Sequence, residues 1–257
     1  MAGVPERVAV FGATSAVAAE AAVLYARRSA RLHLVGRNAA KLEGVAIRCR
    51  REGAAAGAVD VSTHVADFGE LDGNASVVAS AVAALDGIGI ALVAHGDLGD
   101  QLASERTFEG AEPILRVNFT SVVSLLVPLA NHMEAMGEGR IGVITSVAAE
   151  RGRPRNYTYG AAKGALNVYL QGLRTRLYPH DVTVTTIKLG PVATPMTQGH
   201  TKHPLFAKPA GVARGIVRAI DAGRGEAYVP PIWRAIMPVV KSVPEGLFQR
   251  IPFLSGR

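Results

Sequence analysis

The order of apolar and polar segments along the chain is the feature that most constrains its fold. Short segments that are wholly or partly apolar have the length of β-strands, at residues 8–11, 32–35, 59–65, 88–94, 141–145 and 182–189. Longer segments with a helical pattern lie between and after them, at residues 16–28, 39–51, 71–85, 112–136, 159–177 and 212–222. Strands that are apolar throughout are typical of parallel sheets with helices on both faces. The sequence therefore predicts an α/β fold with a Rossmann-type doubly wound parallel sheet.

The composition is compatible with a single folded domain. Of the 257 residues, 49% are hydrophobic, which is enough for a large core. Because we find no repeat and no linker-like stretch, residues 1–229 are expected to form one Rossmann domain. Residues 230–257 differ, since prolines and large apolar residues alternate there with Lys and Arg. We expect this extension either to belong to the same domain or to form a tail that faces a membrane or the substrate.

The net charge of +7 is compatible with an anionic ligand, a nucleic acid or an anionic membrane, but also with a basic surface that has no partner. The sequence contains no helix–turn–helix, zinc or aromatic–basic motif, so no nucleic-acid partner is predicted. The seven histidines have no metal-ligand spacing, and we expect no metal site. The single cysteine, Cys49, excludes an internal disulfide framework.

The N-terminal residues show no basic start followed by an apolar run, and no stretch of about 18 uninterrupted apolar residues occurs. The sequence therefore predicts neither a secretion signal nor a transmembrane helix. The expected compartment is the cytoplasm, or the inner face of the membrane if the C-terminal extension makes peripheral contact there.

The turn between the first strand and the first helix has the position of a phosphate-binding loop. A helix N-terminus there offers free N–H groups, and glycine lets the backbone approach a phosphate. Gly12 is present, whereas Ala16 and Ala18 stand where the dinucleotide-binding pattern has glycine. The turn is compatible either with a pyrophosphate site or with a plain strand–turn–helix capped by a Thr or Ser side chain.

Two charged residues follow the next strands. Arg37 ends the second strand, where a carboxylate would favour NAD; an arginine can form a charge-assisted fork to the 2′-phosphate of NADP. Asp67 follows the third strand and has the place of an adenine contact. Each has a simpler alternative, since Arg37 can be a solvated side chain near a helix start and Asp67 can cap the following helix.

Tyr159 and Lys163 are the most informative pair. Residues four apart lie on the same face of a helix, about one turn apart. An ammonium group there is expected to lower the pKa of the phenol from its usual value of about 10 towards neutrality, which would make it a general acid or base. The same spacing also occurs by chance on helices, so the pair needs support from other positions.

That support comes from three places along the chain. Ser146 ends the preceding apolar strand, and Asn118 lies in the long helix after the strand that ends at residues 94–96. The segment Gly-Pro-Val-Ala-Thr follows the last long strand, at residues 190–194. With Asn, Ser, Tyr and Lys in this order, residues 8–196 resemble the short-chain dehydrogenase/reductase family.

The resemblance implies an oxidoreductase that moves a hydride between a nicotinamide and a carbonyl or alcohol carbon, with NADP(H) favoured and NAD(H) as the alternative. Tyr159 would donate a proton to the carbonyl oxygen, Lys163 would hold the nicotinamide ribose, and Ser146 would hydrogen-bond the carbonyl. Asn118 would support Lys163 through a water. His95 departs from the family's Asn-Ala-Gly strand end and leaves the stabilisation of that strand end in question. The implied cofactor contacts are Gly12, Thr14, Ser15, Ala16, Val17, Arg37, Asp67, Ala94, His95, Gly96, Tyr159, Lys163, Pro191, Val192 and Thr194.

Residues 12–18, 94–101, 151–153 and 228–248 resemble one branch of the family, whose reductase acts on decaprenylphosphoryl-2-keto-erythro-pentose. That likeness implies a lipid-linked keto-sugar substrate. Three arginines between Ser146 and Tyr159 could pair with a substrate phosphate, although arginine clusters are more often only solvated. They are Arg151, Arg153 and Arg155.

Several alternatives stay open. The enzyme could be a generic NADP-dependent alcohol dehydrogenase or a 3-oxoacyl reductase. A non-catalytic NADP-sensing binding protein is a further alternative, although such proteins usually lack the tyrosine or the lysine. The helices at 112–136 and 159–177 are expected to form a homodimer or homotetramer. The mixed apolar and basic segment at 232–241 is typical of a membrane-interfacial helix, a cover over the substrate cleft or a subunit contact.

Overall fold

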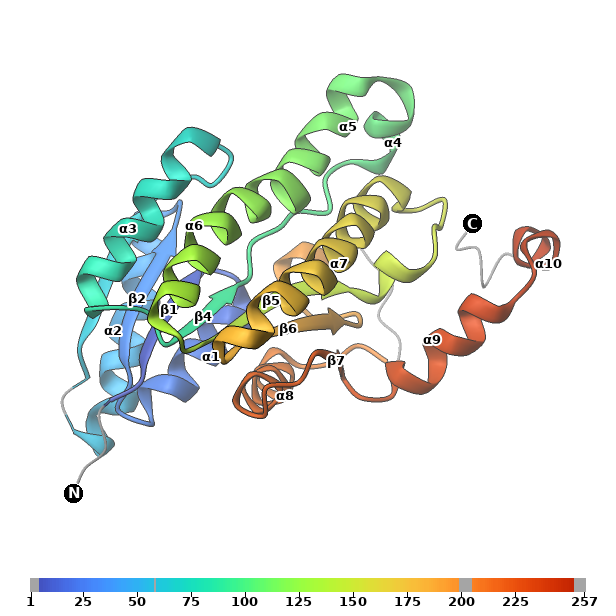
Figure 1. The fold of residues 1–257 in the computed structure, drawn as a ribbon. Coiled ribbons are helices and arrows are strands. Elements are labelled where there is room, and N and C mark those ends of the chain that lie inside the picture. The colour runs from blue at the N-terminus through green and yellow to red at the C-terminus, as the bar shows by residue number, and fades with distance from the viewer. Residues whose placement is uncertain (1–4, 58, 199–204, 252–257) are drawn as a thin grey trace.

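The chain folds around one parallel sheet of seven strands, shown in Figure 1. This computed structural model describes residues 5–57, 59–198 and 205–251. The strand order is β3-β2-β1-β4-β5-β6-β7, and every neighbouring pair is parallel. The predicted doubly wound α/β fold is confirmed. The strands are β1 (Arg7–Phe11), β2 (Arg31–Gly36), β3 (Val61–Val65), β4 (Ile90–Val93), β5 (Gly139–Ser146), β6 (Val182–Leu189) and β7 (Glu226–Val229).

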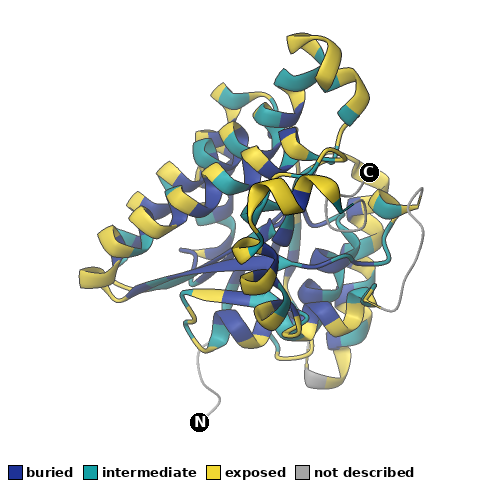
Figure 2. Cartoon of the chain, turned by 90° about the vertical axis from the view of Figure 1, so that its right-hand side faces the viewer, coloured by how far each residue is buried: buried dark blue, intermediate teal, exposed yellow. Residues whose placement is uncertain are grey.

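Helices cover both faces of the sheet and bury two separate apolar clusters. One cluster joins the sheet to α1 (Ala16–Ala26), α2 (Ala39–Gly53) and α8 (Pro209–Asp221). The other joins it to α3 (Asn74–Leu85), α6 (Ser121–Met136) and α7 (Tyr157–Leu177). Successive residues of a strand point to opposite faces, so residues 8–11 of β1 contribute side chains to both clusters and are all apolar. Figure 2 shows the buried residues gathered along the sheet and the inner sides of these helices.

Three elements differ from the prediction. β7 was not predicted, because its four residues include an exposed glutamate and show no continuous apolar run. The segment after β4 contains the short helix α4 (Gln101–Arg106), which is closed at its start by the Asp100 side chain. The long helix begins earlier than predicted, at α5 (Phe108–Leu115), and reaches α6 through a π-helical segment, η3 (Arg116–Thr120). That segment carries Asn118.

The run from α5 to α6 is long and apolar enough to cross a membrane by length and composition alone. In the fold, however, its apolar side is packed against the sheet. Val122, Leu125 and Leu129 are fully buried in the second cluster. Its hydrophobicity is therefore used for the core of this domain.

The C-terminal extension folds into α9 (Trp233–Ser242) and α10 (Glu245–Arg250). A third apolar cluster joins both helices to the 3-10 turn η4 (Val147–Glu150), which directly follows β5. Trp233, Met237 and Phe248 are the largest side chains of this cluster. Residues 230–251 thus pack on the main body of the protein. Residues 252–257, also part of the predicted extension, lie outside the described residues, and the boundary at 229 stays a prediction.

Candidate active site and cofactor cleft

The sheet order creates the cleft in which the predicted site residues gather. The chain runs from β1 outward to β3 on one side and from β4 outward to β7 on the other. In doubly wound sheets, ligands bind at this reversal, outside the carboxyl ends of the strands. The turn after β1 and the strand end at Ala94 lie here, and Ala94 N–H donates to the Phe11 carbonyl.

Gly12 has a geometric reason to be glycine. Its φ is +87°, and a Cβ atom there would lie 2.6 Å from the backbone nitrogen of His95. The turn is fixed by the N–H groups of Gly12 and Ala13, which both donate to the Val35 carbonyl at 2.9 Å. The turn therefore passes close to β2 and β4, with room for a backbone but not for a side chain.

The start of α1 is open to an anion. Ser15 occupies the N-cap position, but its side chain makes no capping hydrogen bond. This observation disfavours the alternative of a helix start capped by serine. Val17 and Ala18 are buried against the sheet. Ala18 stands where the dinucleotide-binding pattern has glycine, and alanine is still small enough for helix and strand to pack closely there. The arrangement suits a pyrophosphate, because the first-turn N–H groups are left without a side-chain acceptor.

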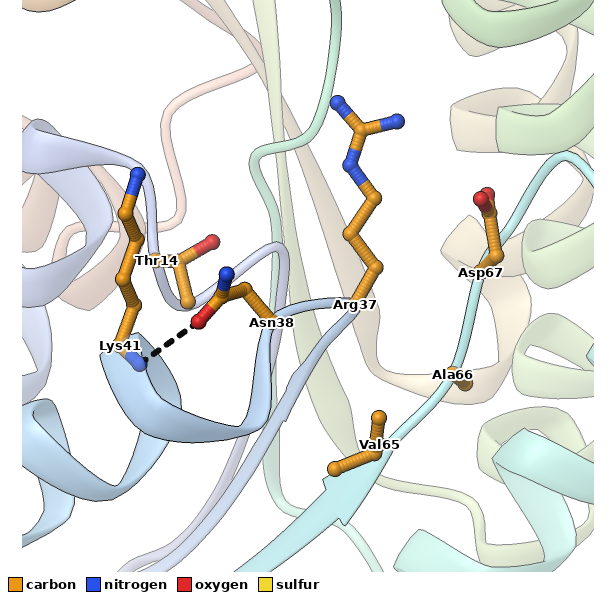
Figure 3. A pocket seen from close by; sticks show the side chains of 7 residues that line it. All are labelled: Thr14, Arg37, Asn38, Lys41, Val65, Ala66 and Asp67. Carbon is orange, nitrogen blue, oxygen red and sulfur yellow. Dashed lines mark hydrogen bonds between the residues drawn. The ribbon is translucent and has the colours of Figure 1, made fainter.

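A cleft of about 720 Å³ continues from this turn along the ends of β2 and β3. Figure 3 shows Arg37 standing between Lys41 and Thr14 on one side and Asp67 on the other. Asn38 caps α2 by accepting a hydrogen bond from Lys41 N–H at 2.9 Å. The sequence prediction included Arg37 but missed Lys41. The signal was present in the spacing, because a residue three positions after the cap lies in the first helical turn, close to the strand end.

Asp67 lies at the opposite wall of this cleft and is exposed. Its carboxylate accepts a hydrogen bond from Gly69 N–H at 2.9 Å, which closes a local turn. The N-cap of the next helical segment, η2 (Leu71–Gly73), is Glu70. The alternative that Asp67 caps the following helix is therefore wrong. What the structure shows for Asp67 is that it lines the cleft.

The strand end 94–96 is stabilised by a histidine in a neutral form. His95 Nε2 lies 2.8 Å from Ser121 Oγ, whose hydroxyl donates to the Val117 carbonyl. Since Ser121 uses its only hydrogen there, His95 Nε2 must be the donor. Burial, followed by the charges of Lys163 and Arg37, lowers the pKa of His95 to about 3. The doubt raised by the sequence is resolved, because His95 anchors the strand end to the start of α6.

The predicted catalytic pair, Tyr159 and Lys163, lies on one face of α7, facing the end of β5. Lys163 is 2% exposed, and its Nζ donates to the Ile144 carbonyl at 3.3 Å. This Nζ lies 5.9 Å from the centre of the Tyr159 ring. The Tyr159 hydroxyl is hydrogen-bonded to Ser146, which sits at the end of β5. The structure thus brings Ser146, Tyr159 and Lys163 together, as the sequence predicted.

Asn118 lies behind this pair and fixes the loop after β4. Its amide group donates to the carbonyls of Asp97 and Ile114, at 2.6 and 2.9 Å, and its oxygen accepts from Asp97 N–H at 3.2 Å. A Cβ atom on Gly96 would lie 2.7 Å from Asn118 Oδ1 and 3.2 Å from Lys163 Nζ. Asn118 therefore acts directly on the backbone, and the water relay to Lys163 stays a prediction.

The electrostatics differ from the expectation for Tyr159. Burial raises the pKa of Tyr159 to about 12, and the hydrogen bond from Ser146 opposes that shift. The pKa of Tyr159 is therefore raised rather than lowered as expected, because desolvation of the phenolate outweighs any attraction by Lys163. Burial also lowers the pKa of Lys163 to about 8. Within the described residues, Lys163 forms no ion pair with a carboxylate, so an anionic or polar ligand would stabilise its charged form.

The loop after β6 carries the last group of predicted cofactor contacts. Pro191 and Ala193 pair with Ala207 through two backbone hydrogen bonds, of 3.0 and 2.9 Å. Val192 is buried, and Thr194 N–H donates to Thr197 Oγ1 at 3.2 Å. The loop is held in a defined shape beside Ser146, because Leu189 of β6 lies opposite Ser146 in the sheet.

The three arginines that were predicted to meet a substrate phosphate have different environments. Arg151 is not available for a ligand, because its guanidinium donates to the carbonyls of Val240, Lys241 and Val243 and pairs with Glu245 at 2.8 Å. It also stacks on the ring of a buried phenylalanine in α10, 4.0 Å from the ring centre. The prediction for Arg151 is therefore wrong: this side chain fastens the C-terminal helices.

The other two arginines, like Arg151, lie in the chain between Ser146 and Tyr159. Arg153 is half-buried, and burial lowers its pKa. Its Nε is buried without a hydrogen-bond partner, and the described part of the chain provides no carboxylate for it. Arg155 is exposed. Of the three, Arg153 has the environment that an anionic ligand would best complete.

This geometry fits a dinucleotide. The start of α1 has no side-chain cap, and two cations line the cleft at β2. Residues 6–204 match the family model described as short chain dehydrogenase. The chain is 35% identical over 245 residues to an uncharacterized oxidoreductase of Mycobacterium tuberculosis, covering 95% of this chain and 96% of that protein.

An uncharacterized oxidoreductase of Streptomyces coelicolor is 29% identical and is matched over 97% of both chains. Among solved structures, a short chain dehydrogenase from Burkholderia cenocepacia in complex with NADP has a TM-score of 0.79 and 20% identity, with 96% of this chain and 97% of that chain covered. Levodione reductase has a TM-score of 0.80 and the same identity, with 90% and 98% covered. These two structures support the fold. On the family model and the relatives, the chain belongs to the short-chain dehydrogenase/reductase family and is an NAD(P)-dependent oxidoreductase that acts on CH–OH and C=O groups.

Proposed function

We propose that this protein reduces a ketone to a secondary alcohol, with Tyr159 as the proton donor and NADP(H) as the favoured cofactor. The observation that carries the proposal is the contact of Ser146, Tyr159 and Lys163 at the carboxyl end of β5. NADPH, when bound, supplies the hydride to the carbonyl carbon. The carbonyl oxygen takes its proton from the Tyr159 hydroxyl, so the product is a neutral alcohol.

The protonation state of Tyr159 is compatible with this direction of reaction. With a pKa of about 12 the phenol is protonated at neutral pH, which is the form that a proton donor needs. The Ser146 hydroxyl can orient the carbonyl oxygen towards Tyr159 and stabilise the phenolate left after the transfer. The Lys163 ammonium stabilises the same phenolate through its charge and would hold the nicotinamide ribose.

The cofactor preference rests on the cleft at the end of β2. Arg37 and Lys41 line it together, and no carboxylate takes the place at the strand end where a ribose 2′-hydroxyl would be bound. A 2′-phosphate placed there would meet two cations and the N-terminus of α2. We propose that the remaining contacts named from the sequence, from Thr14 to Thr194, bind the rest of the cofactor.

For the substrate, we propose a phosphorylated keto-sugar, including a lipid-linked one, with Arg153 binding the phosphate. The support is the half-buried guanidinium of Arg153, which has no carboxylate partner among the described residues. Arg155 is proposed as a weaker second contact. The competing substrates are a simple ketone and a 3-oxoacyl thioester, for which Arg153 would have no specific role.

A substrate panel separates these possibilities. Oxidation of NADPH is followed at 340 nm with a phosphorylated keto-sugar, an uncharged keto-sugar, a cyclic ketone and a 3-oxoacyl thioester. We expect turnover of the phosphorylated compound to exceed that of its uncharged analogue, and Arg153→Gln to remove the difference. Equal turnover of the two would refute the phosphate contact. NADPH binding without turnover of any ketone would favour a non-catalytic NADP-sensing protein.

Two partner interactions stay predictions. α9 and α10 expose Ile232, Val239 and Leu247 beside basic residues, so peripheral contact with an anionic membrane surface remains open. Co-sedimentation with vesicles that contain anionic lipid tests it, and an entirely soluble protein would refute it. α6 and α7 expose Val127 and Val168, in line with a homodimer or homotetramer. Light scattering after size-exclusion chromatography gives the mass in solution, and a monomer would refute that prediction.

A further inference from the structure

A largely buried group of charged residues lies at the turn η4, which directly follows Ser146. Lys188 of β6 binds two carboxylates, with its Nζ 2.7 Å from Glu150 Oε1 and 2.9 Å from Glu226 Oε2. The hydroxyl of Tyr228 donates to the same Glu150 oxygen at 2.7 Å. One oxygen of Glu150 thus joins η4 to β6 and β7.

The burial of this group makes its pairing important. The side chains of Glu150 and Lys188 are only 4% and 8% exposed, while that of Glu226 is 36% exposed. Burial alone would lower the pKa of Lys188, but its hydrogen bonds to the two carboxylates outweigh burial and raise it. Removal of one partner from a buried pair leaves an uncompensated charge. The group is therefore a rigid joint rather than a loosely held surface cluster.

Glu150 is the last residue of η4, the short turn that directly follows Ser146. Ser146 Oγ accepts a hydrogen bond from Ala148 N–H at 3.1 Å, inside this turn. The next contacts are with α7, since a Cβ on Gly160 would lie 2.8 Å from the Ala148 carbonyl oxygen. A Cβ on Gly164 would lie 3.2 Å from the carbonyl oxygen of Ala149.

These two glycines directly follow Tyr159 and Lys163 in the chain. The backbone of η4 consequently touches α7 beside both catalytic side chains, and the position of η4 sets how Ser146 faces Tyr159. On the other side, η4 packs against α9 through Val147 and Trp233. Of the hydrogen bonds that hold η4, those of Glu150 are the ones that reach the sheet itself.

We propose that Glu150, Lys188 and Tyr228 are positioning residues, whose buried hydrogen bonds to one carboxylate oxygen hold η4 so that the Ser146 hydroxyl and the Tyr159 phenol reach the same carbonyl oxygen. This inference rests on the proposed roles of Ser146 and Tyr159. None of the three touches the substrate or the cofactor in this account. They act through the backbone of η4, and their loss changes geometry at the reacting atoms.

The first test uses substitutions of Glu150 in the full-length protein. Glu150→Gln keeps an oxygen that can accept both hydrogen bonds and should retain most of the activity. Glu150→Ala removes both and should lower kcat about 10-fold to 100-fold, because small displacements of reacting groups have effects of this size. The KM for NADPH should stay within about twofold, since η4 does not line the cofactor cleft at β2. Glu226→Gln, on the solvent side of Lys188, is the matched control.

The second measurement does not depend on turnover. The protein is labelled with ¹³C at the tyrosine Cζ atoms, and the Tyr159 signal is assigned among the six tyrosines by its loss in Tyr159→Phe. The chemical shift reports the hydrogen bond to the phenol. Ser146→Ala gives the shift of a phenol without the serine, and Glu150→Ala should move the signal in the same direction, while Glu150→Gln and Glu226→Gln should not.

The outcomes separate this inference from the proposed function. A wild-type Tyr159 signal in folded Glu150→Ala would overturn the positioning role, whether or not turnover is found. Equal losses of kcat in Glu150→Ala and Glu226→Gln would overturn it as well, because the charge of the group rather than the anchor of η4 would then matter. Circular dichroism shows whether Glu150→Ala folds. If it does not, Tyr228→Phe is used in its place, because it removes the hydrogen bond from Tyr228 to Glu150 and leaves the Lys188 ion pairs. Tyr228→Phe should then lower kcat and shift the Tyr159 signal, and unchanged values would refute the role.

Discussion

Replacement of Arg37 and Lys41 tests how this cleft chooses its nicotinamide cofactor. Both side chains are exposed at the carboxyl end of β2 and the first turn of α2, on one wall of the cleft. Hydrogen bonds to a charged group contribute about 1.5–3 kcal/mol when well formed, and exposed ion pairs contribute about 1 kcal/mol or less. Because both cations are solvated, we expect about 1–2 kcal/mol for Arg37, whose planar fork can bind a phosphate with two hydrogen bonds, and less for Lys41.

These energies translate into measurable affinity ratios. Since about 1.4 kcal/mol corresponds to a tenfold change, Arg37→Ala should weaken NADPH binding about 5-fold to 30-fold, and Lys41→Ala about threefold. NADH has no 2′-phosphate, and its affinity should stay within about twofold in both variants. Arg37→Glu should weaken NADPH further by repulsion between the carboxylate and the phosphate. The effect should shrink as salt is raised, because the pairs are exposed.

The assay is a parallel titration of NADPH and NADH, followed by cofactor fluorescence, at low and high salt. Arg51→Ala is the matched control, because Arg51 is an exposed arginine at the opposite end of the same helix. It should leave both affinities unchanged. Equal weakening of NADPH and NADH by Arg37→Ala would refute the assignment, since the residue would then act on the fold of the cleft. No change with either cofactor would remove Arg37 as a selector.

Three further predictions follow from individual contacts. Gly96→Ala should destabilise the protein by about 1–3 kcal/mol in urea unfolding, because the new methyl group meets Asn118 and Lys163. Gly152→Ala is the control and should have little effect, because the space around Gly152 is open. Equal effects of the two substitutions would contradict the packing argument. Burial, followed by the charge of His64, lowers the pKa of His33 to about 4 in the folded state. The stability that the neutral His33 contributes is therefore present above its unfolded pKa of about 6.5 and is lost as the pH falls towards 4, by roughly 2 kcal/mol at pH 5. A His33→Gln variant that loses the same stability at pH 5 would refute His33 as the source. Arg151→Met should speed amide hydrogen exchange in α9 and α10, because three carbonyls lose their hydrogen-bond donor. Exchange in α8 is the control and should stay as in the wild type. Unchanged exchange in α9 would contradict the role of Arg151 in fastening the C-terminal helices.

Much of the fold follows from the sequence because its physical cause is local. β6 has the predicted bounds, because its β-branched residues, Val, Thr and Ile, favour a strand over eight successive positions. β7 gives no such signal, because its four residues at the sheet edge include an exposed glutamate. The π-helical segment at Asn118 was equally invisible, and the hydrogen bonds that accompany it reach the distant loop at Asp97.

The site shows the same division. Ser146, Tyr159 and Lys163 could be predicted because a strand end and a helical spacing bring them together. Arg151 could not be assigned correctly, since its partners lie about 90 residues away in sequence and only the folded chain reveals that its donors are already used. The pKa of Tyr159 could not be predicted either, because it depends on how much water reaches the phenol, and burial outweighs the nearby ammonium.

The central claim is that Tyr159 donates the proton in a ketone reduction, and a pair of tyrosine substitutions tests it most directly. Tyr159→Phe and Tyr157→Phe are compared with the wild type in NADPH binding and in kcat/KM for a ketone from the substrate panel. Tyr157 lies two residues before Tyr159 on the same helix and is 44% exposed, so Tyr157→Phe should leave NADPH binding and kcat/KM unchanged. Tyr159→Phe should bind NADPH as the wild type does and lose about 100-fold to 10,000-fold in kcat/KM. Turnover close to that of the wild type in Tyr159→Phe would contradict the account.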